Sequence, residues 1–389
     1  MAEKKILMAA CNYWESPFQV GSHNIAKAFV QNGWKVAFIS DPVSMFHYLK
    51  KNDPEISARL KNNKEGGKWD LNNKVWAYVP FALITPFNSF FLKSLFVLKN
   101  WYRWSVPFLK NKLRQKGFDK VDLIYIDSTY QSFFLDIIEY EKAFFRIADK
   151  NSGFSKFTSQ METIEKMMAR KVDLIIYSAK NLEHSIDVLD PKEKRFIPNG
   201  VNFAHFSKGN KSKPIDFQNI PRPIAVYVGA ISNWFDFNLV NFAAEHLPHI
   251  SFVIIGNKNQ ALMQLEQNKN VFILGTKNYS ELPGYLYNSD VGIIPFNLAE
   301  NPDLVNSINP LKMYEYMACG LPVVSVEWDE LKNLNSPAIL AKTYEEFTTA
   351  IQNIISGEIE MNKSVLQKYA ESNDWKQRIN KFISDLDIK

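Results

Sequence analysis

The chain has 389 residues, 46% hydrophobic and 22% charged, which is the balance of ordinary globular proteins and enough length for two domains. Its two cysteines, Cys11 and Cys319, cannot form a disulfide framework or a tetrahedral zinc site, so disulfide-rich and structural-zinc classes are excluded. The formal net charge of +5 is uneven: residues 1–200 hold 30 Lys and Arg against 21 Asp and Glu, whereas residues 201–389 hold 16 against 20. The basic half predicts an anionic partner, whether lipid, nucleic acid or an acidic substrate.

Short apolar runs that read as strands alternate with amphipathic stretches through the first half of the chain. The runs lie at residues 6–10, 36–40, 75–80, 123–127, 144–147 and 174–178, and the segments between them, such as 25–31 and 161–170, are predicted helices. No hydrophobic leader precedes the first run, so we expect no secretory signal and a cytoplasmic protein. The polar, proline-rich residues 208–223 predict an inter-domain linker.

The alternation resumes beyond this linker, at residues 224–228, 252–255, 271–274, 291–295 and 322–326. Because strands that alternate with helices form parallel sheets, we predict an α/β protein with two doubly wound domains, residues 1–205 and 222–363. In such sheets ligands lie beyond the carboxyl ends of the strands. Two such domains facing one cleft would suit a transferase with two substrates.

The segment 309–325, NPLKMYEYMACGLPVVS, carries the strongest chemical signal. It predicts a short helix with Asn309 as N-cap and Pro310 in the first helical position, and a following strand. The start of such a helix offers free N–H groups and a positive dipole to a diphosphate, and Lys312 adds a full charge there. Glu315, one turn further on, could accept hydrogen bonds from a ribose diol. An ordinary surface pair of Lys312 and Glu315 is the plain alternative.

The same string resembles the donor-binding segment of GT-B glycosyltransferases, whose recurrent pattern is EAMACGxPVV. The resemblance implies that Lys312 binds the diphosphate and Glu315 the ribose of a nucleotide sugar. It also places the following residues at or near the donor: Pro310, Leu311, Met313, Gly229, Trp234 and Phe296, the last near the base. Many retaining members have a second Glu eight positions before the ribose-binding one, where this chain has Ser307. The tail from residue 364 to 389 resembles the closing GT-B helix that packs back on the first domain.

A narrower resemblance concerns the first half of the chain. Residues 144–149, FFRIAD, resemble the Tyr-Arg-Ala-Ser-Asp segment of the xanthan glucuronosyltransferase family, which inverts the sugar's configuration. The resemblance implies that Asp149 is the general base that takes the proton from the acceptor hydroxyl. Asp127, at the end of the preceding strand, and then Glu15 are the alternative bases. A helix-capping role is the plain alternative for Asp149.

Residues 81–118 combine seven Lys and Arg with many aromatic side chains and contain no acidic residue. Aromatic and basic side chains together favour the interface of an anionic membrane, so we expect peripheral contact there. The contact residues that we predict are Lys93, Lys99, Trp101, Arg103 and Trp104. The alternatives are a helix buried against the sheet, with its lysines in solvent, and a nucleic-acid patch, for which no binding motif is present.

Together these features predict an inverting GT-B glycosyltransferase at the cytoplasmic face of the cell membrane. The expected donor is a UDP-sugar, with glucuronate as the sugar that the family suggests. The expected acceptor is a lipid-linked or polymeric saccharide of an exopolysaccharide, capsule or wall polymer. No metal or other cofactor is expected, because the helix start and Lys312 can neutralise the leaving diphosphate. A UDP-sugar 2-epimerase of the same fold and a non-catalytic, membrane-bound nucleotide-sugar binding module are the alternatives.

Overall fold

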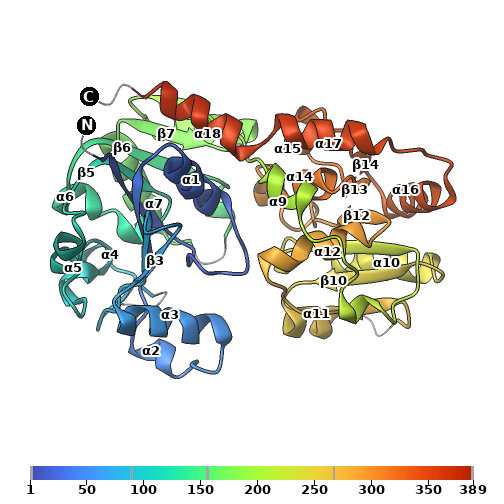
Figure 1. The fold of residues 1–389 in the computed structure, drawn as a ribbon, viewed down its shortest axis with the longest axis horizontal. Helices are drawn as coiled ribbons and strands as arrows, with labels where there is room; N and C mark the ends of the chain where they lie inside the picture. The colour runs from blue at the N-terminus through green and yellow to red at the C-terminus, as the bar shows by residue number, and fades with distance from the viewer. Residues whose placement is uncertain (1–2, 88, 90, 155–156, 266–267, 387–389) are drawn as a thin grey trace. The chain divides into compact units, whose positions relative to one another are not determined.

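The computed structural model describes residues 3–87, 89, 91–154, 157–265 and 268–386 (Figure 1). It divides into an N-terminal unit, Met1–Ser16, Val20–Pro198 and Ile379–Lys389, and a C-terminal unit, Pro17–Gln19 and Asn199–Arg378. The main division therefore falls after Pro198 and not at residue 205. The tail is also shared: only its residues from Ile379 onward belong to the N-terminal unit, whereas we expected the whole segment 364–389 to pack there.

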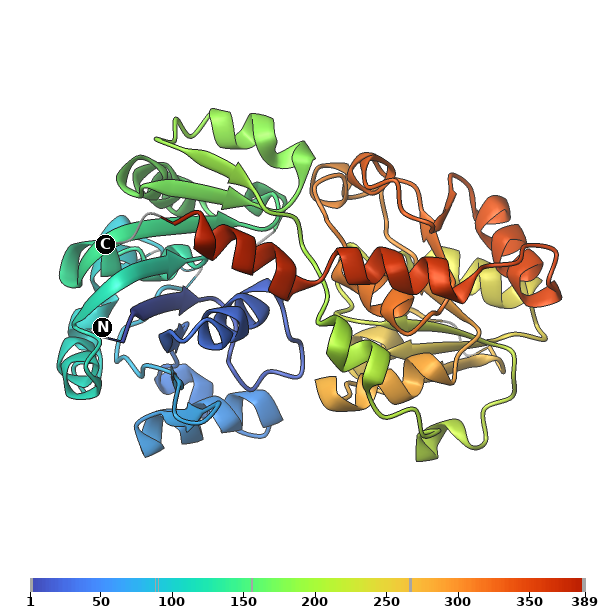
Figure 2. The ribbon, with the colours of Figure 1, turned by 45° about the horizontal axis from the view of Figure 1, so that its top comes forward.

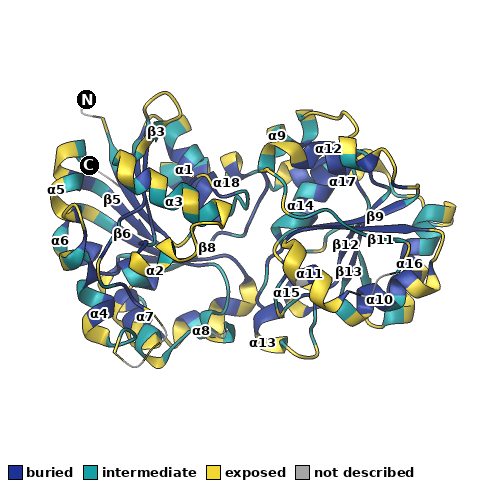
Figure 3. Cartoon of the chain, turned by 90° about the horizontal axis from the view of Figure 1, so that it is seen from below, coloured by how far each residue is buried: buried dark blue, intermediate teal, exposed yellow. Residues whose placement is uncertain are grey.

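The N-terminal unit is built on an eight-stranded sheet of order β3-β4-β2-β1-β5-β6-β7-β8. All neighbouring strands are parallel except β3 and β4. Its central strands are buried on both faces, which explains their unbroken apolar sequences (Figure 3). The strands are β1 (Lys5–Ala10), β2 (Lys35–Ser40), β3 (Lys68–Asp70), β4 (Val75–Tyr78), β5 (Lys120–Ile126), β6 (Glu139–Ile147), β7 (Leu174–Tyr177) and β8 (Lys194–Phe196).

Helices cover both faces of this sheet. Leu7 and Ala9 of β1 face a core cluster that includes Leu98, Leu113 and Met168 from α4, α5 and α7. Helix α1 instead packs along β1 and β2 outside that cluster. The helices of this unit are α1 (Gly21–Gln31), α2 (Met45–Tyr48), α3 (Pro54–Glu65), α4 (Leu95–Asn100), α5 (Leu109–Lys116), α6 (Phe134–Ile137), α7 (Ser159–Lys171), α8 (Glu183–Asp187) and the end of α18 (Trp375–Ser384).

The C-terminal unit holds a six-stranded, fully parallel sheet of order β11-β10-β9-β12-β13-β14. The strand order reverses between β9 and β12, and ligands of such sheets lie beyond the carboxyl ends of the strands at this point. The strands are β9 (Ile224–Val228), β10 (Ser251–Ile255), β11 (Val271–Ile273), β12 (Val291–Ile294), β13 (Val323–Val326) and β14 (Ile339–Ala341).

Two helix groups pack on the C-terminal sheet. Helix α14 contacts α9 and α17, and Figure 2 shows α17 (red) running beside α14 (orange). Helices α10 and α16 form the second group, with α16 against β13 and β14. The helices are α9 (Phe203–Lys208), α10 (Phe237–His246), α11 (Lys258–Gln264), α12 (Leu282–Tyr287), α13 (Pro302–Val305), α14 (Leu311–Ala318), α15 (Asp329–Asn333), α16 (Tyr344–Ser356) and α17 (Lys363–Ser372).

The segment predicted as a linker, residues 208–223, is part of the C-terminal unit. Its Phe217 is fully buried and its Ile220 nearly so, both within the C-terminal core cluster. The polar composition of the segment suggested a free connector, but these two apolar residues anchor it to the unit that follows.

Candidate active site

Helix α14 begins at Leu311, one residue later than the sequence predicted. Pro310 holds the N-cap position with an extended backbone, and among the described residues no side chain caps the helix there. Asn309 is not the cap but a buried anchor: its Oδ1 accepts a hydrogen bond from the Tyr314 hydroxyl at 3.1 Å, and its carbonyl oxygen accepts one from Asn199 Nδ2 at 2.8 Å. The first turn of α14 is thus held in place without a side chain on its N–H groups, as anion binding at a helix start requires.

The approach of α14 to the sheet depends on Gly292 in β12. A Cβ atom at Gly292 would lie 2.3 Å from Cδ2 of the Tyr316 ring. Tyr316 is fully buried, and its hydroxyl accepts a hydrogen bond from the backbone N–H of Val228, the last residue of β9, at 2.8 Å. The helix is therefore fixed against the two strands that flank the point where the strand order reverses.

Lys312 reaches from α14 to the end of β9. Its ammonium group lies 4.7 Å from the ring centroid of Phe296 and 5.3 Å from that of Tyr227, within the range of cation–π attraction. Gly229 makes room for it: this residue has φ +153°, and a Cβ there would lie 3.0 Å from Lys312 Cε. These contacts hold a positive charge near the start of α14.

Phe296 supports Lys312 and offers little of its own surface. Its ring is buried and stacks on Trp328 with centroids 5.4 Å apart. The strand end that carries it pairs with the loop after β9, through a bridge between Phe235 and Phe296 and a hydrogen bond from Asn297 N to Trp234 O at 2.8 Å. Trp234 is half-buried against the core. Contact of Phe296 or Trp234 with a base stays a prediction.

Leu311 and Met313, the residues on either side of Lys312 in α14, differ in solvent exposure. Leu311 is half-buried at the helix start, whereas Met313 is fully buried and packs in the core. Met313 therefore supports the helix from beneath.

Glu315 is half-buried, and its carboxylate forms no hydrogen bond with any residue that the structure describes. Burial raises its pKa to about 7, although the Lys312 charge opposes the shift. A carboxylate that is shielded from water and lacks a protein donor is suited to accept hydrogen bonds from ligand hydroxyls.

Tyr279 is a neighbour of Glu315 that the sequence did not single out. Burial raises the pKa of the Tyr279 phenol well above its usual value, and the Glu315 charge adds to this, which places the two groups near each other. His205 holds the Tyr279 ring by stacking at 4.4 Å between centroids and by a 3.0 Å hydrogen bond to the Tyr279 carbonyl oxygen. No motif marks Tyr279, because its place beside Glu315 depends on packing between segments far apart in the chain.

A cavity of about 620 Å³ lies at the carboxyl ends of β12, β13 and β14. Phe296 lines it, but Lys312, Glu315 and Gly229 do not. The charged side chains in its lining are Asp236, Glu300, Glu327, Asp329 and Lys342. This acidic balance would repel a diphosphate, so the helix start and not this cavity is the candidate donor site.

In the N-terminal unit, Asp149 lies half-buried just beyond the end of β6. The capping alternative does not fit the observed helix starts. Thr158 caps α7, with its Oγ1 accepting from Met161 N at 3.3 Å, and Lys150 occupies the N-cap position of the short helical turn Asn151–Gly153. Asp149 therefore holds the cap position of neither helix, and its predicted role as the base stays open.

Asp127, the runner-up base, is held by several donors. Its carboxylate accepts hydrogen bonds from Cys11 N at 2.9 Å, the Ser22 hydroxyl, and the Tyr125 hydroxyl at 3.4 Å. Burial raises its pKa, while these donors and Arg146 oppose the shift. The arrangement ties the loop after β1 and the start of α1 to β5, which favours a structural role.

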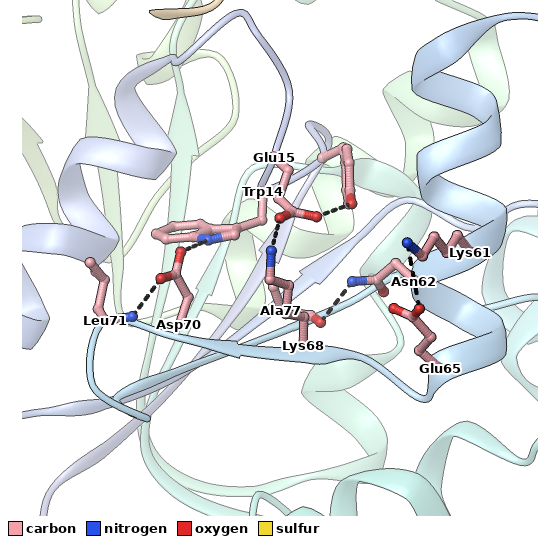
Figure 4. Close-up of polar contacts among 10 residues, drawn as sticks. Trp14, Glu15, Lys61, Asn62, Glu65, Lys68, Asp70, Leu71 and Ala77 are labelled. Carbon is pink, nitrogen blue, oxygen red and sulfur yellow. Dashed lines mark hydrogen bonds and ion pairs between the residues drawn. The ribbon is translucent and has the colours of Figure 1, made fainter. Parts of the chain in front are cut away.

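Glu15, the third candidate base, is also paired, as Figure 4 shows. Its carboxylate accepts a hydrogen bond from the Tyr13 hydroxyl at 2.6 Å and forms an ion pair with Lys68 of β3. Burial acts to raise the pKa of Glu15, but the bonds from Lys68 and Tyr13 outweigh it and leave the pKa below its ordinary value. A carboxylate whose basicity is lowered in this way is a poor general base.

The basic aromatic segment 81–118 forms α4, α5 and the loops around them. Trp101 is fully buried, with its Nε1 donating to Tyr130 O at 2.6 Å, so the prediction that it contacts a membrane is wrong. Trp104 is half-buried beside Phe96. Arg103 is exposed, and Lys93 and Lys99 are half-exposed. Several large apolar side chains of the segment are exposed: Leu83, Phe87, Phe91, Leu95, Phe96, Val106 and Phe108.

No helix in the part of the chain that the structure describes is long and apolar enough to cross a membrane. Within that same part, no three His, Cys, Asp or Glu side chains are grouped closely enough to hold a metal ion.

Both halves of the chain match known protein families. Residues 8–178 match the family described as glucuronosyltransferase GumK, N-terminal domain, and residues 222–357 match the glycosyl transferases group 1. The putative teichuronic acid biosynthesis glycosyltransferase TuaH of Bacillus subtilis (strain 168) is 25% identical over 249 residues. That match covers 59% of this chain and 60% of TuaH, less than two thirds of the relative's length.

Solved structures share the whole fold. Sucrose-phosphate synthase from Thermosynechococcus elongatus has a TM-score of 0.71 at 15% identity, over 98% of each chain. The Anabaena protein HepE, in complex with UDP and glucose, has a TM-score of 0.64 at 15% identity, over 99% of this chain and 100% of that one. The predicted fold and family resemblance are thereby confirmed. The chain has the GT-B fold, and its two halves are similar to the GumK N-terminal domain and to the glycosyl transferases group 1.

Proposed function

We propose that this protein transfers a sugar, with glucuronate as the leading candidate, from a UDP-sugar to a membrane-associated saccharide acceptor with inversion of configuration. The acceptor would be a lipid-linked or polymeric saccharide in the synthesis of an exopolysaccharide, capsule or wall polymer. The teichuronic acid description of TuaH and the GumK match over residues 8–178 support this substrate class.

The observation that carries the proposal is the pair of Lys312 and Glu315 on α14. The helix start and the Lys312 ammonium offer positive charge to a diphosphate. The Glu315 carboxylate, one turn further on, can accept hydrogen bonds from hydroxyl groups. Charge for the diphosphate beside an acceptor for the ribose is what a nucleoside diphosphate requires. The UDP bound to HepE, a protein of the same fold, supports a uridine nucleotide.

Inversion needs one carboxylate on the acceptor side and none acting on the sugar from the donor side. Asp149, just beyond the end of β6, would take the proton of the acceptor hydroxyl. At the same time the oxygen of that hydroxyl would attack the anomeric carbon of the sugar, and the bond from this carbon to the UDP oxygen would break. Residue 307, where many retaining members of the fold carry a glutamate, is a serine in this chain, and the lack of a carboxylate at that position supports the same stereochemistry. Lys312 and the helix start would stabilise the leaving diphosphate, so the proposal requires no metal.

The proposed membrane contact uses the exposed apolar side chains of segment 81–118 and the adjoining α2. Phe81 joins the two, by a bridge to Val43 and a ring contact with Tyr48 at 6.2 Å. Helix α2 and the next residue add exposed Met45, Phe46 and Leu49 (Figure 3). With the lysines and arginines of the segment around them, these side chains suit an anionic lipid surface.

The test separates donor binding from transfer. Isothermal titration with UDP should show Lys312→Ala binding about 10- to 100-fold more weakly than wild type, because a charge-assisted contact is lost. Lys332→Ala, which changes an exposed side chain on α15, is the matched control and should bind like wild type. Asp149→Asn should bind UDP normally yet lose transfer by about 10²- to 10⁴-fold. Unchanged UDP affinity in Lys312→Ala, or full transfer by Asp149→Asn, would contradict the assigned roles.

A further inference from the structure

Asp41 stands out among the carboxylates of the N-terminal unit. It follows the last residue of β2, so it lies at the carboxyl edge of the sheet, as do Cys11 after β1 and Asp127 after β5. Ligands of doubly wound sheets bind beyond this edge. No motif of the sequence includes Asp41, and neither the donor site nor the proposed base uses it.

Only one side of the Asp41 carboxylate is occupied. Oδ1 accepts hydrogen bonds from Ser128 Oγ at 2.5 Å and from Gln131 Nε2 at 3.1 Å. Oδ2 accepts none from the residues that the structure describes. Burial raises the pKa of Asp41 to about 7 in spite of the two donors, so the half-buried group is shielded from water. Its position is fixed, because Arg59 Nη2 donates to the Asp41 carbonyl oxygen at 2.8 Å.

The surroundings of Asp41 are polar and only partly satisfied. Three buried oxygens belong to Ser40, which precedes Asp41, to Gln131, which donates to it, and to Ser132, which follows Gln131. These atoms, Ser40 Oγ, Gln131 Oε1 and Ser132 Oγ, have no hydrogen-bond partner among the described residues. Such atoms are uncommon inside folded proteins and are usually satisfied by water or a ligand. Gln131 itself is fully buried, with its Nε2 also donating to the carbonyl oxygens of Ala10 and Ile39, both at 3.1 Å.

An aromatic ring stands beside this polar cluster. Burial raises the pKa of the half-buried Tyr130 phenol, and the Asp41 charge adds to the shift, so the two groups are near each other. The backbone of Tyr130 is held by the indole of Trp101, which donates to its carbonyl oxygen at 2.6 Å. Tyr130 is thus placed on a rigid part of the unit.

We propose that Asp41, Ser128 and Tyr130 form a saccharide-binding subsite for the acceptor. In its ionised form the Asp41 carboxylate, with its unfilled oxygen, accepts hydrogen bonds from sugar hydroxyls and disfavours phosphate, which argues against a nucleotide or a lipid diphosphate at this position. The Tyr130 ring offers a face to the apolar side of a sugar ring. The inference deepens the proposed function and rests on its claim that the acceptor is a saccharide.

Saturation-transfer NMR with cellobiose and methyl β-D-glucopyranoside as probes tests this subsite on the full chain. We expect wild type to bind at least one of these sugars, and Asp41→Asn to bind it about tenfold more weakly, since a hydrogen bond to a charged group is lost. Tyr130→Ala should weaken binding in the same direction. Asp122→Asn is the matched control, because Asp122 lies in β5 and, within the described part of the chain, its carboxylate accepts only from Lys5 N at 2.5 Å.

UDP titration of the same variants tests the acceptor subsite separately from the proposed function. If Asp41→Asn loses sugar binding and keeps wild-type UDP affinity, the subsite is supported. If neither sugar binds wild type, if Asp41→Asn and Tyr130→Ala bind sugar like wild type, or if Asp41→Asn loses UDP affinity as well, the subsite is refuted. Failure of wild type to bind UDP would instead overturn the proposed function, whatever the sugar data show.

Discussion

Glu315 in the C-terminal unit and Asp41 in the N-terminal unit share an environment that Glu15 lacks. Both are half-buried, both have a pKa raised to about 7 by burial, and each has at least one carboxylate oxygen that no described residue fills. Glu15 has its carboxylate bonded to Lys68 and Tyr13, and its pKa is lowered. A fold tolerates the cost of a shielded, unfilled carboxylate only where something else requires it. We therefore expect Glu315 and Asp41, and not Glu15, to face ligands.

The raised pKa of Glu315 has a consequence for stability. Because its folded-state pKa of about 7 exceeds the unfolded value near 4.5, folding favours the protonated form, and stability falls as pH rises between these two values. Glu315→Gln removes this penalty. After a discount for solvent contact, the penalty that the variant avoids is ~2 kcal/mol of unfolding free energy. We therefore expect the difference in melting temperature between variant and wild type to increase by about 4–8 °C from pH 5 to pH 8. Differential scanning calorimetry would measure it, with exposed Glu358→Gln as the control. A pH-independent difference would contradict the shielded state of Glu315.

At the residue scale, the sequence predicted the positions of residues that belong to a motif. It did not predict residues that become important only through packing against distant segments. Lys312 and Glu315 lie where segment 309–325 implied, on the first turns of a helix at the sheet edge. Tyr279 and Asp41 were missed, because each becomes significant only through neighbours from distant segments. Trp101 was misplaced for the same reason: an interfacial tryptophan and a buried one look alike until the partner of the indole N–H is known.

At the scale of elements, apolar runs predicted most of the strands and fixed the α/β class. The strands that the pattern missed are β3, β8 and β14, each three residues long and largely exposed or half-buried, so they lack a long apolar run. Helix α14 was predicted, but its first residue was not, since Pro310 took the cap position and Asn309 turned inward. The contact that sets the depth of α14 joins Gly292 of β12 to the Tyr316 ring.

Gly292→Ala tests that contact. The added methyl group would meet the Tyr316 ring at 2.3 Å and displace α14 from β12, so we expect a loss of about 1–3 kcal/mol of stability and weaker UDP binding. Adding Tyr316→Ala, which removes the whole ring that the new methyl group would meet, should make the double variant less impaired than the sum of the single changes. Chemical denaturation of the four proteins measures the cycle. Additive losses would mean that the glycine matters for some reason other than the approach of α14.

At the scale of the whole molecule, the uneven charge of the sequence has a structural counterpart. The basic half of the chain forms the unit that carries exposed phenylalanines among its lysines and arginines, and the acidic half forms the unit with the predicted donor site. The length and composition already indicated two α/β domains. They did not indicate that residues 208–223 join the C-terminal core or that the tail is shared between the units, because both depend on a few apolar side chains in polar segments.

Membrane contact is the prediction that belongs to this scale. Phe96 and Phe108 are each about 60% exposed among basic residues, and transferring such rings to the lipid interface contributes about 1.5–3 kcal/mol each, with about 1 kcal/mol from each nearby Lys or Arg. Phe96→Asp with Phe108→Asp should therefore release the protein from phosphatidylglycerol vesicles in a sedimentation assay. Val188→Asp with Ile215→Asp changes apolar residues elsewhere that are at least as exposed, and it should leave binding intact. Equal binding to neutral vesicles, or loss in both double variants, would refute a specific basic and aromatic contact surface.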